Sequence, residues 1–516
     1  MSDDSSPVPR RAFLKGTLAT TMLTTTAELA RTAYAEGKST AASLIQQENA
    51  RPGADDWQLT RVRVDGDGFR SPWIEGYCSR QSVSAGESVD VMVSCNPART
   101  FRLELFRMGY YGGKGARLVK SYGPLEATTQ PTPKPGEKNL HECRWQPSLT
   151  IDIPEDWLSG VYIGRLTTIP KEGEAYWQSH IVFVVRDNRP ADILFQVSDN
   201  TWQAYNRWPN NYSIYTHPKG VQGPWADVSF DRPYAREAQH NGVVDDPRTV
   251  GSGEFLPFEF PLAYWLEQHG YDVSYCSNSD MLTPERGLKC KAFISVGHDE
   301  YWDIRQFYSV QKMRDEGVNL LFLSGNTICW VTPFRESSRG TPNRIIFRGG
   351  PYGGEQSHAV TRHEEHGPFP HRGPDEGLLM GARNVRPVNG GGDWTITKPD
   401  HWIFAGTGVK QGDSIPGLVG WEYHGNPAEI DGLEVVAGGT AWQGGVNPQN
   451  WTATIYPGPK GNYVFNAATI FWAQGLSAPP GHVLPWSHWS RPHGPDVRVQ
   501  QMTHNLLRRA IQSKTA

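Results

Sequence analysis

The stretch that most constrains the fold is KAFISVGHDEYW, residues 291–302, an apolar run that ends abruptly in polar and aromatic residues. Residues 292–296 are too few for a helix and are closed by Gly297, so they predict a buried strand. Asp303 then offers a helix N-cap, apolar residues follow at helical spacing, and Gly317 lies just past the last of them. This pattern predicts a strand followed directly by a helix.

A second apolar run, VNLLFLSGN, follows that helix and ends at Gly325 and Asn326. Strand, helix and strand in this order predict a βαβ crossover with two parallel strands. In such sheets ligands bind at the carboxyl ends of the strands. We therefore expect His298, Asp299, Glu300 and Asn326 to lie together at one edge of the sheet.

Length and composition exclude some partners. A chain of 516 residues with 38% hydrophobic residues exceeds one ordinary core, which predicts at least two domains. The net charge is −4 with both signs interspersed, so we expect neither a nucleic-acid partner nor a cationic membrane-binding face.

The many aromatic residues leave two interpretations open: plugs beneath long loops, or a lining that binds sugars or amides.

Residues 1–35 predict a twin-arginine export signal, followed by a linker over residues 36–56. The segment PRRAFLK (9–15) carries paired arginines, residues 16–30 are weakly apolar, and Ala-Tyr-Ala (33–35) resembles a cleavage site. No later segment approaches 18 uninterrupted apolar residues, so no membrane span is expected after signal removal. The predicted location is periplasmic or extracellular.

Residues 57–186 predict an antiparallel β sandwich, because VSAGESVDVMVSC, LSGVYIGRLTTI and WQSHIVFVVR alternate apolar and polar residues at sandwich-like intervals. Residues 187–190, DNRP, mark a linker. Residues 191–490 alternate strand and helix patterns, which predicts an α/β domain with a mostly parallel sheet. Residues 491–516 predict a C-terminal helix. The expected fold class is thus α+β and multidomain.

The strand-end residues restrict the chemistry. No G-x-S-x-G motif and no nucleophile follow the central strand, which disfavours covalent acyl transfer. Paired-carboxylate glycosidase geometry is not evident, so a glycosidase stays a minor interpretation. The remaining oxygen donors are Glu300, Asn326 and the phenols of Tyr205 and Tyr234, and oxygen ligands suit a hard cation. From the residues alone, a metal site and a hydrogen-bonded structural loop both remain open.

Four motifs in order resemble the large subunit of N,N-dimethylformamidase and its relatives: TWQAYN (201–206), SFDRPY (229–234), GHDEYW (297–302) and FLSGN (322–326). The similarity covers roughly residues 57–475. It implies a β domain joined to a glutamine amidotransferase-like α/β domain. It also implies a mononuclear ferric ion, Fe(III), held by two tyrosinates and a glutamate.

Carried over by motif, the resemblance implies the metal ligands Tyr205, Tyr234 and Glu300. It places His298 and Asn326 beside them, together with Glu422 of GLVGWEYH, as catalytic residues. His298 would relay a proton to the leaving amine, while the other two would hold water or substrate.

These observations predict an exported, metal-dependent, dimethylformamidase-like hydrolase of a C–N bond in a small amide. This sequence shows nothing of the separate small subunit that accompanies the large subunit of N,N-dimethylformamidase. A homo-oligomer is compatible with the pattern. The alternative from another functional class is an exported carbohydrate-binding or structural protein with a vestigial α/β site.

Overall fold

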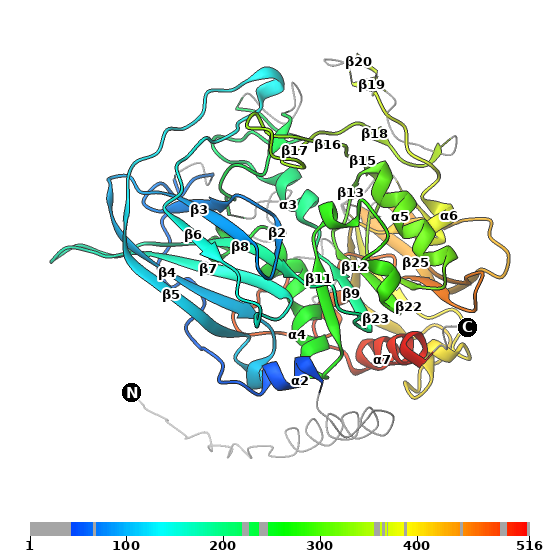
Figure 1. Cartoon of the computed structure of the whole chain (residues 1–516). Coiled ribbons are helices and arrows are strands. Elements are labelled where there is room, and N and C mark those ends of the chain that lie inside the picture. The colour runs from blue at the N-terminus through cyan, green and yellow to red at the C-terminus, as the bar shows by residue number, and fades with distance from the viewer. Residues whose placement is uncertain are drawn as a thin grey trace, which may run out of the picture. The chain divides into compact units, whose positions relative to one another are not determined.

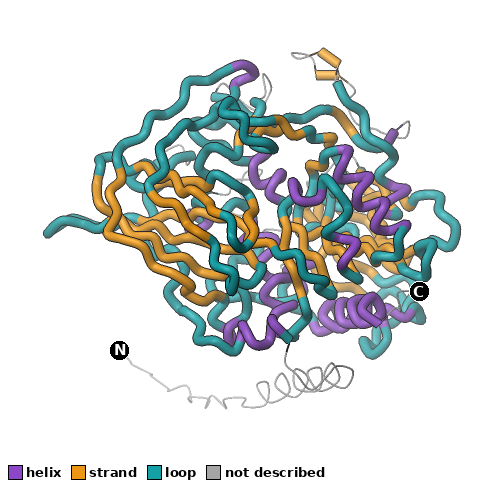
Figure 2. The backbone as a smooth tube through the Cα atoms, viewed as in Figure 1, coloured by secondary structure: helices purple, strands orange, loops and turns teal. Residues whose placement is uncertain are grey.

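The computed structural model describes residues 43–65, 69–218, 226–236, 246–354, 362–363, 367–368, 370–385, 390–443, 447–485 and 493–512. The predicted export signal lies outside these residues. The chain from Leu44 onward forms one compact unit. Within the described residues, no helix combines the length and the apolar character needed to cross a bilayer. Strands make up most of the regular structure (Figure 2), so the chain has a mixed α+β fold with several sheets.

Two sheets in the first half of this unit share one apolar core. The smaller has the order β1-β3-β6, with β1 (Glu75–Cys78), β3 (Ser88–Ser94) and β6 (Leu149–Asp152). The larger has the order β2-β8-β7-β4-β5, with β2 (Ser82–Ser84), β4 (Arg99–Met108), β5 (Ala116–Ala127), β7 (Gly160–Thr168) and β8 (Gln178–Arg186). All neighbours pair antiparallel except β2 and β8. Val91, Phe101 and Phe183 belong to the shared core, which explains the alternating sequence pattern.

A nine-stranded sheet forms the centre of the second half (Figure 1). Its order is β11-β9-β12-β14-β27-β26-β25-β22-β23. The parallel strands are β9 (Ile193–Gln196), β11 (Val273–Cys276), β12 (Ala292–Gly297), β14 (Asn319–Ser324) and β27 (Tyr463–Asn466). The antiparallel strands are β22 (Gly390–Thr395), β23 (Ser414–Trp421), β25 (Glu434–Gln443) and β26 (Asn447–Pro457).

The predicted βαβ unit is confirmed, and the prediction of a mostly parallel sheet is only half right. β12 and β14 pair in parallel, and all their residues are buried, as expected of strands covered on both faces. The four strands beyond β27 in the sheet order, β26, β25, β22 and β23, pair antiparallel with their neighbours. The sheet is therefore mixed.

Six α-helices are described: α2 (Leu44–Asn49), α3 (Asp199–Tyr205), α4 (Phe260–Gln268), α5 (Ile304–Asp315), α6 (Gly377–Met380) and α7 (Val497–Gln512). A π-helix, Phe255–Glu259, leads into α4. Asp303 caps α5 as predicted, accepting a hydrogen bond from the Arg305 amide at 2.8 Å. Phe307 of α5 and Leu379 of α6 join Phe322 of β14 in one apolar cluster, so these helices cover the same face of the sheet.

The remaining short strands form two three-stranded sheets and two strand pairs. They are β13 (Tyr301–Trp302), β15 (Trp330–Val331) and β18 (Gly350–Pro351); β10 (Val228–Ser229), β16 (Phe334–Arg335) and β17 (Ile345–Ile346); β21 (Ala382–Asn384) and β24 (His424–Pro427); and β19 (Arg362–His363) and β20 (Gly367–Pro368).

Candidate metal centre

Three separate segments bring carboxylates and an imidazole to one point. β12 ends at Gly297, whose φ of +64° permits the sharp turn into His298 and Glu300. Glu422 follows β23, the last strand in the sheet order. Asn326 follows β14 in the left-handed conformation, with φ +50°. The site is therefore assembled from strand ends that are far apart in sequence, as the crossover pattern predicted for His298, Glu300 and Asn326.

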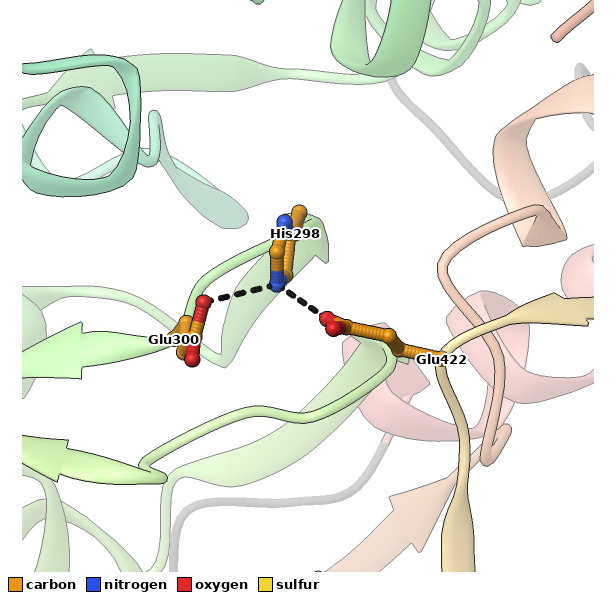
Figure 3. A group of neighbouring side chains, drawn as sticks. All are labelled: His298, Glu300 and Glu422. Carbon is orange, nitrogen blue, oxygen red and sulfur yellow. Dashed lines mark ion pairs between the residues drawn. The ribbon is translucent and has the colours of Figure 1, made fainter. Parts of the chain in front are cut away.

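His298 lies between the two carboxylates (Figure 3). Its Nε2 is 3.1 Å from Glu300 Oε2 and 2.5 Å from Glu422 Oε2. Asn326 Nδ2 donates to Glu422 Oε2 at 3.1 Å. The three residues His298, Glu300 and Glu422 are at most 2% exposed, and their ligand atoms lie within 4.8 Å of one another. The spacing suits donors gathered around one ion.

Tyrosine hydroxyls surround Glu300. Tyr205, the last residue of α3, donates to Glu300 Oε2 at 2.7 Å, and Tyr215 donates to Glu300 Oε1 at 3.1 Å. The Tyr301 hydroxyl in turn hydrogen-bonds the Tyr215 hydroxyl. Tyr205 and Tyr215 are half-buried, whereas the carboxylates are fully buried. Among these side chains, the two tyrosines are thus the more exposed ones.

The structure does not bring Tyr234 to this cluster. Its ring packs edge-on against Trp202 at 6.4 Å, and it lines a different cavity with Asp199 and Arg344. Sequence reasoning missed Tyr215, which lies in the loop YSIYT. Its position is fixed locally, because the Tyr215 amide donates to Ser213 Oγ at 3.1 Å. That turn signal is readable in the sequence, but nothing in it points to Glu300.

Burial and charge set the protonation states of the cluster. Burial disfavours the imidazolium, yet Glu422 and Glu300 outweigh it and raise the pKa of His298 well above its usual value. Burial raises the pKa of Glu422, whereas hydrogen bonds from His298, Tyr205 and Tyr215 outweigh burial and lower the pKa of Glu300. Burial, followed by the Glu300 charge, raises the pKa of Tyr205 well above its usual value. Without a cation the phenols therefore stay protonated.

Asp299 has a different task from its two neighbours. Its Oδ2 accepts from Gln196 Nε2 at 2.6 Å and Ser295 Oγ at 2.8 Å, and its Oδ1 accepts from Asn278 Nδ2 at 3.0 Å. These bonds direct the carboxylate back into the sheet rather than toward Glu300 and Glu422. Asp299 anchors the turn, and Glu300 is left to face the phenols.

A second anchor holds the loop of Asn326. The Thr327 amide donates to His424 Nε2 at 3.0 Å, and His424 Nδ1 lies 2.8 Å from Asn466 Oδ1. Burial lowers the pKa of His424 to about 4, so the ring is neutral and Nε2 can accept. His424 thereby fixes the turn that directs Asn326 toward Glu422.

The donor set fits a hard cation. Two carboxylates, one imidazole and two half-buried phenols converge in a small volume, and oxygen donors of this kind suit trivalent iron. The two buried carboxylates, Glu300 and Glu422, also favour a bound cation. A cation would relieve the repulsion between Glu300 and Glu422, and it would allow phenols to lose their protons.

Comparisons with known proteins point to one family. No curated protein matches the chain. Among solved structures, the chain is similar to a family 123 glycoside hydrolase from Clostridium perfringens with 10% identity and a TM-score of 0.11, over 51% of this chain and 39% of that one. A TM-score so low supports no inference about this chain. Residues 102–485 match the family described as N,N-dimethylformamidase beta subunit-like, C-terminal. Because this match covers most of its length, the chain belongs to the N,N-dimethylformamidase beta subunit-like family.

Proposed function

We propose that the protein is an exported hydrolase that uses a mononuclear Fe(III) ion to cleave the C–N bond of a small amide. The family name supports a dimethylformamidase-like hydrolase. The observation that carries the metal dependence is the buried convergence of His298, Glu300 and Glu422 beneath two phenols. Nothing in the net charge favours a nucleic-acid partner.

The proposed ligands are Glu300, Tyr205 and Tyr215. Two phenolates and one carboxylate balance three positive charges, and both phenols already contact Glu300. Tyr215 takes the place that the sequence resemblance gave to Tyr234, because Tyr234 faces a different cavity. When bound, the ion would polarise the amide carbonyl and lower the pKa of water.

The remaining residues transfer protons and orient the reacting groups. Glu422, held by Asn326 Nδ2 at 3.1 Å, is placed to accept a proton from the attacking water. His298 Nε2, 2.5 Å from Glu422, is placed to deliver a proton to the amine nitrogen as the C–N bond breaks. One water is consumed, and the products are a carboxylic acid and an amine. The half-buried phenol side leaves a route for the substrate.

Iron content and amide turnover of matched variants test this function. Tyr205→Phe, Tyr215→Phe and Glu300→Gln should each lose iron, the visible tyrosinate absorption and amine release from formamide or N,N-dimethylformamide. Each substitution keeps the packing and removes one donor. Tyr234→Phe is the control and should keep iron and colour.

Equal iron in all four variants would reject the ligand set. Loss of iron in Tyr234→Phe but not in Tyr215→Phe would restore the original motif assignment. An iron-free wild type that binds glycans and releases no amine would support the carbohydrate-binding alternative instead.

A further inference from the structure

Three arginines gather around two tryptophans near the starts of β4 and β8. The guanidinium carbons of Arg61 and Arg63 lie 4.9 and 5.5 Å from the ring centroid of Trp177. Those of Arg63 and Arg99 each lie 4.8 Å from the ring centroid of Trp73. The two indole rings adjoin, with centroids 5.7 Å apart. We call these five residues the arginine–tryptophan surface.

Hydrogen bonds hold the backbone from which these side chains project. The Arg61 carbonyl accepts from the amide of Gln178, the first residue of β8, at 2.9 Å. The Arg63 carbonyl accepts from Ser71 Oγ at 2.9 Å, two residues before Trp73. The segment with the two arginines is therefore fixed both to β8 and to the loop of Trp73, and the arginine–tryptophan surface belongs to the folded body of the first half.

The surface presents positive charge to solvent. Arg61 and Arg63 are exposed, and neither forms an ion pair within the part of the chain that the structure describes. Arg99 is half-buried, and its Nη1 lies 3.7 Å from Oε2 of Glu174, which is 49% exposed. So long and exposed a pair contributes little. Among the described residues, one carboxylate thus pairs with three guanidinium groups, which makes this surface cationic on a chain of net charge −4.

Contact with the rings prepares the guanidinium groups to bind planar anions. A free arginine side chain loses rotamer freedom when it binds a partner, and this loss lowers the affinity. An indole ring beneath the guanidinium restricts its plane before binding, whereas the N–H groups at its edge remain available. Two such N–H groups match the two oxygens of a carboxylate. The surface therefore suits a partner that presents several carboxylates.

The rings and the surrounding surface decide between kinds of polyanion. Single-stranded nucleic acids bind by stacking bases on aromatic faces, but guanidinium groups already lie over both indole rings. A surface that enters a bilayer adds exposed apolar side chains, and within the described residues none of the exposed large apolar side chains belongs to this surface. The indole N–H groups of Trp73 and Trp177 donate to no other described residue, so they are available to sugar hydroxyls.

We propose that the arginine–tryptophan surface binds an acidic polysaccharide. Carboxylates on neighbouring sugars pair with the guanidinium groups, and sugar hydroxyls accept from the two indole N–H groups. This binding does not depend on the proposed hydrolase activity, because none of the five residues belongs to the cluster of His298, Glu300 and Glu422.

Calorimetric titration of the whole protein with alginate, a polyuronate, tests the surface. The wild type should bind alginate at low ionic strength, bind it more weakly as salt is added, and not bind neutral dextran. Arg61→Gln combined with Arg63→Gln should weaken binding about tenfold, the scale of two exposed ion pairs. The control combines Lys312→Gln with Lys460→Gln, which removes the same charge from exposed positions elsewhere and should bind like the wild type.

A lysine variant separates this surface from general attraction between charges. Arg61→Lys combined with Arg63→Lys keeps the charge but loses the planar fork, so its affinity should fall nearly as far as that of the glutamine variant. Equal urea midpoints show that the variants are folded. Absence of alginate binding by the wild type, or wild-type affinity in either arginine variant, would overturn the proposal. Tighter binding of single-stranded oligo(dT) than of alginate would also overturn it and assign the surface to nucleic acid.

Discussion

At the scale of single residues, His298 occupies the position that decides the mechanism. Its Nε2 contacts both carboxylates, so the geometry suits either a proton carrier or a metal ligand. The resemblance assigns the first role, and the two phenols near Glu300 supply enough oxygen donors without the imidazole. The two roles make opposite predictions about metal content.

We expect His298→Ala to retain most of its iron and to lose amide turnover by about 10²–10⁴-fold, the usual scale of general acid–base assistance. The three oxygen ligands are untouched, so the visible absorption should persist. Iron content and turnover are measured on one preparation, with Glu300→Gln as the metal-losing reference. Iron loss equal to that reference would make His298 a ligand, and unchanged turnover would remove it from the mechanism.

At the scale of elements, a buried ion pair joins β4 to α4. Arg107 Nη2 and Nη1 donate to the two oxygens of Glu267 at 2.8 and 3.0 Å, and neither side chain is exposed. Asn49 and Tyr275 donate to the same carboxylate at 2.8 and 3.0 Å. The Glu267 carboxylate, which accepts hydrogen bonds on both oxygens, therefore joins the β sheets of the first half to α4.

Glu267→Gln should destabilise the protein by about 3–5 kcal/mol, because it leaves the Arg107 charge buried without its counter-ion. Urea denaturation measures the change. The control is Glu316→Gln, which breaks exposed pairs with Lys460 at 2.6 Å and Lys312 at 3.9 Å and should unfold at the same urea concentration as the wild type. Equal midpoints for Glu267→Gln and the control would show that the pair contributes nothing to stability.

A second element-scale prediction concerns Glu376, which precedes α6. Its Oε1 accepts from the Asn384 amide at 3.1 Å, and Asn384 Nδ2 donates to the Thr327 carbonyl at 3.1 Å, beside Asn326. Burial raises the pKa of Glu376 from 4.5 to about 7. Between these values the unfolded chain loses a proton that the folded chain keeps, so the wild type loses stability as pH rises.

Glu376→Gln removes this titration. Relative to the variant, the wild type should lose stability on the order of 1–3 kcal/mol between pH 4.5 and 7 and regain none above it. Urea denaturation at pH 5 and pH 8 measures the difference, with exposed Glu155→Gln as a control that should follow the wild type. If the free energy of unfolding changes equally with pH in the wild type and in Glu376→Gln, the Glu376 carboxyl is not buried in its neutral form.

At the scale of the whole molecule, the remaining prediction is export. Replacing Arg10 and Arg11 with Lys should retain the chain in the cytoplasm, because twin-arginine export depends on the guanidinium pair. Fractionation followed by immunoblotting measures the location. Efficient export of the double variant would contradict the twin-arginine interpretation, and the same variant should keep its iron if the metal is acquired before export.

The sequence alone determined the local elements and their chemistry. KAFISVGHDEYW predicts β12 and the turn after it, and Asp303 predicts the start of α5, because short apolar runs and caps act over a few residues. The order of strand, helix and strand likewise predicts that His298, Glu300 and Asn326 lie together at one edge of the sheet. The family resemblance added Glu422 and Tyr205, and the structure brings both to that edge.

Only the tertiary structure decided which residues meet across distant strands. Whether Tyr215 or Tyr234 faces Glu300 depends on loop paths that no local pattern encodes, since both lie in irregular segments rich in aromatic residues. The antiparallel half of the central sheet likewise follows from long-range pairing, in which the order β27-β26-β25-β22-β23 is set by packing against the whole sheet. Contacts between segments separated by a hundred residues or more, such as His298 with Glu422, come from that assembly.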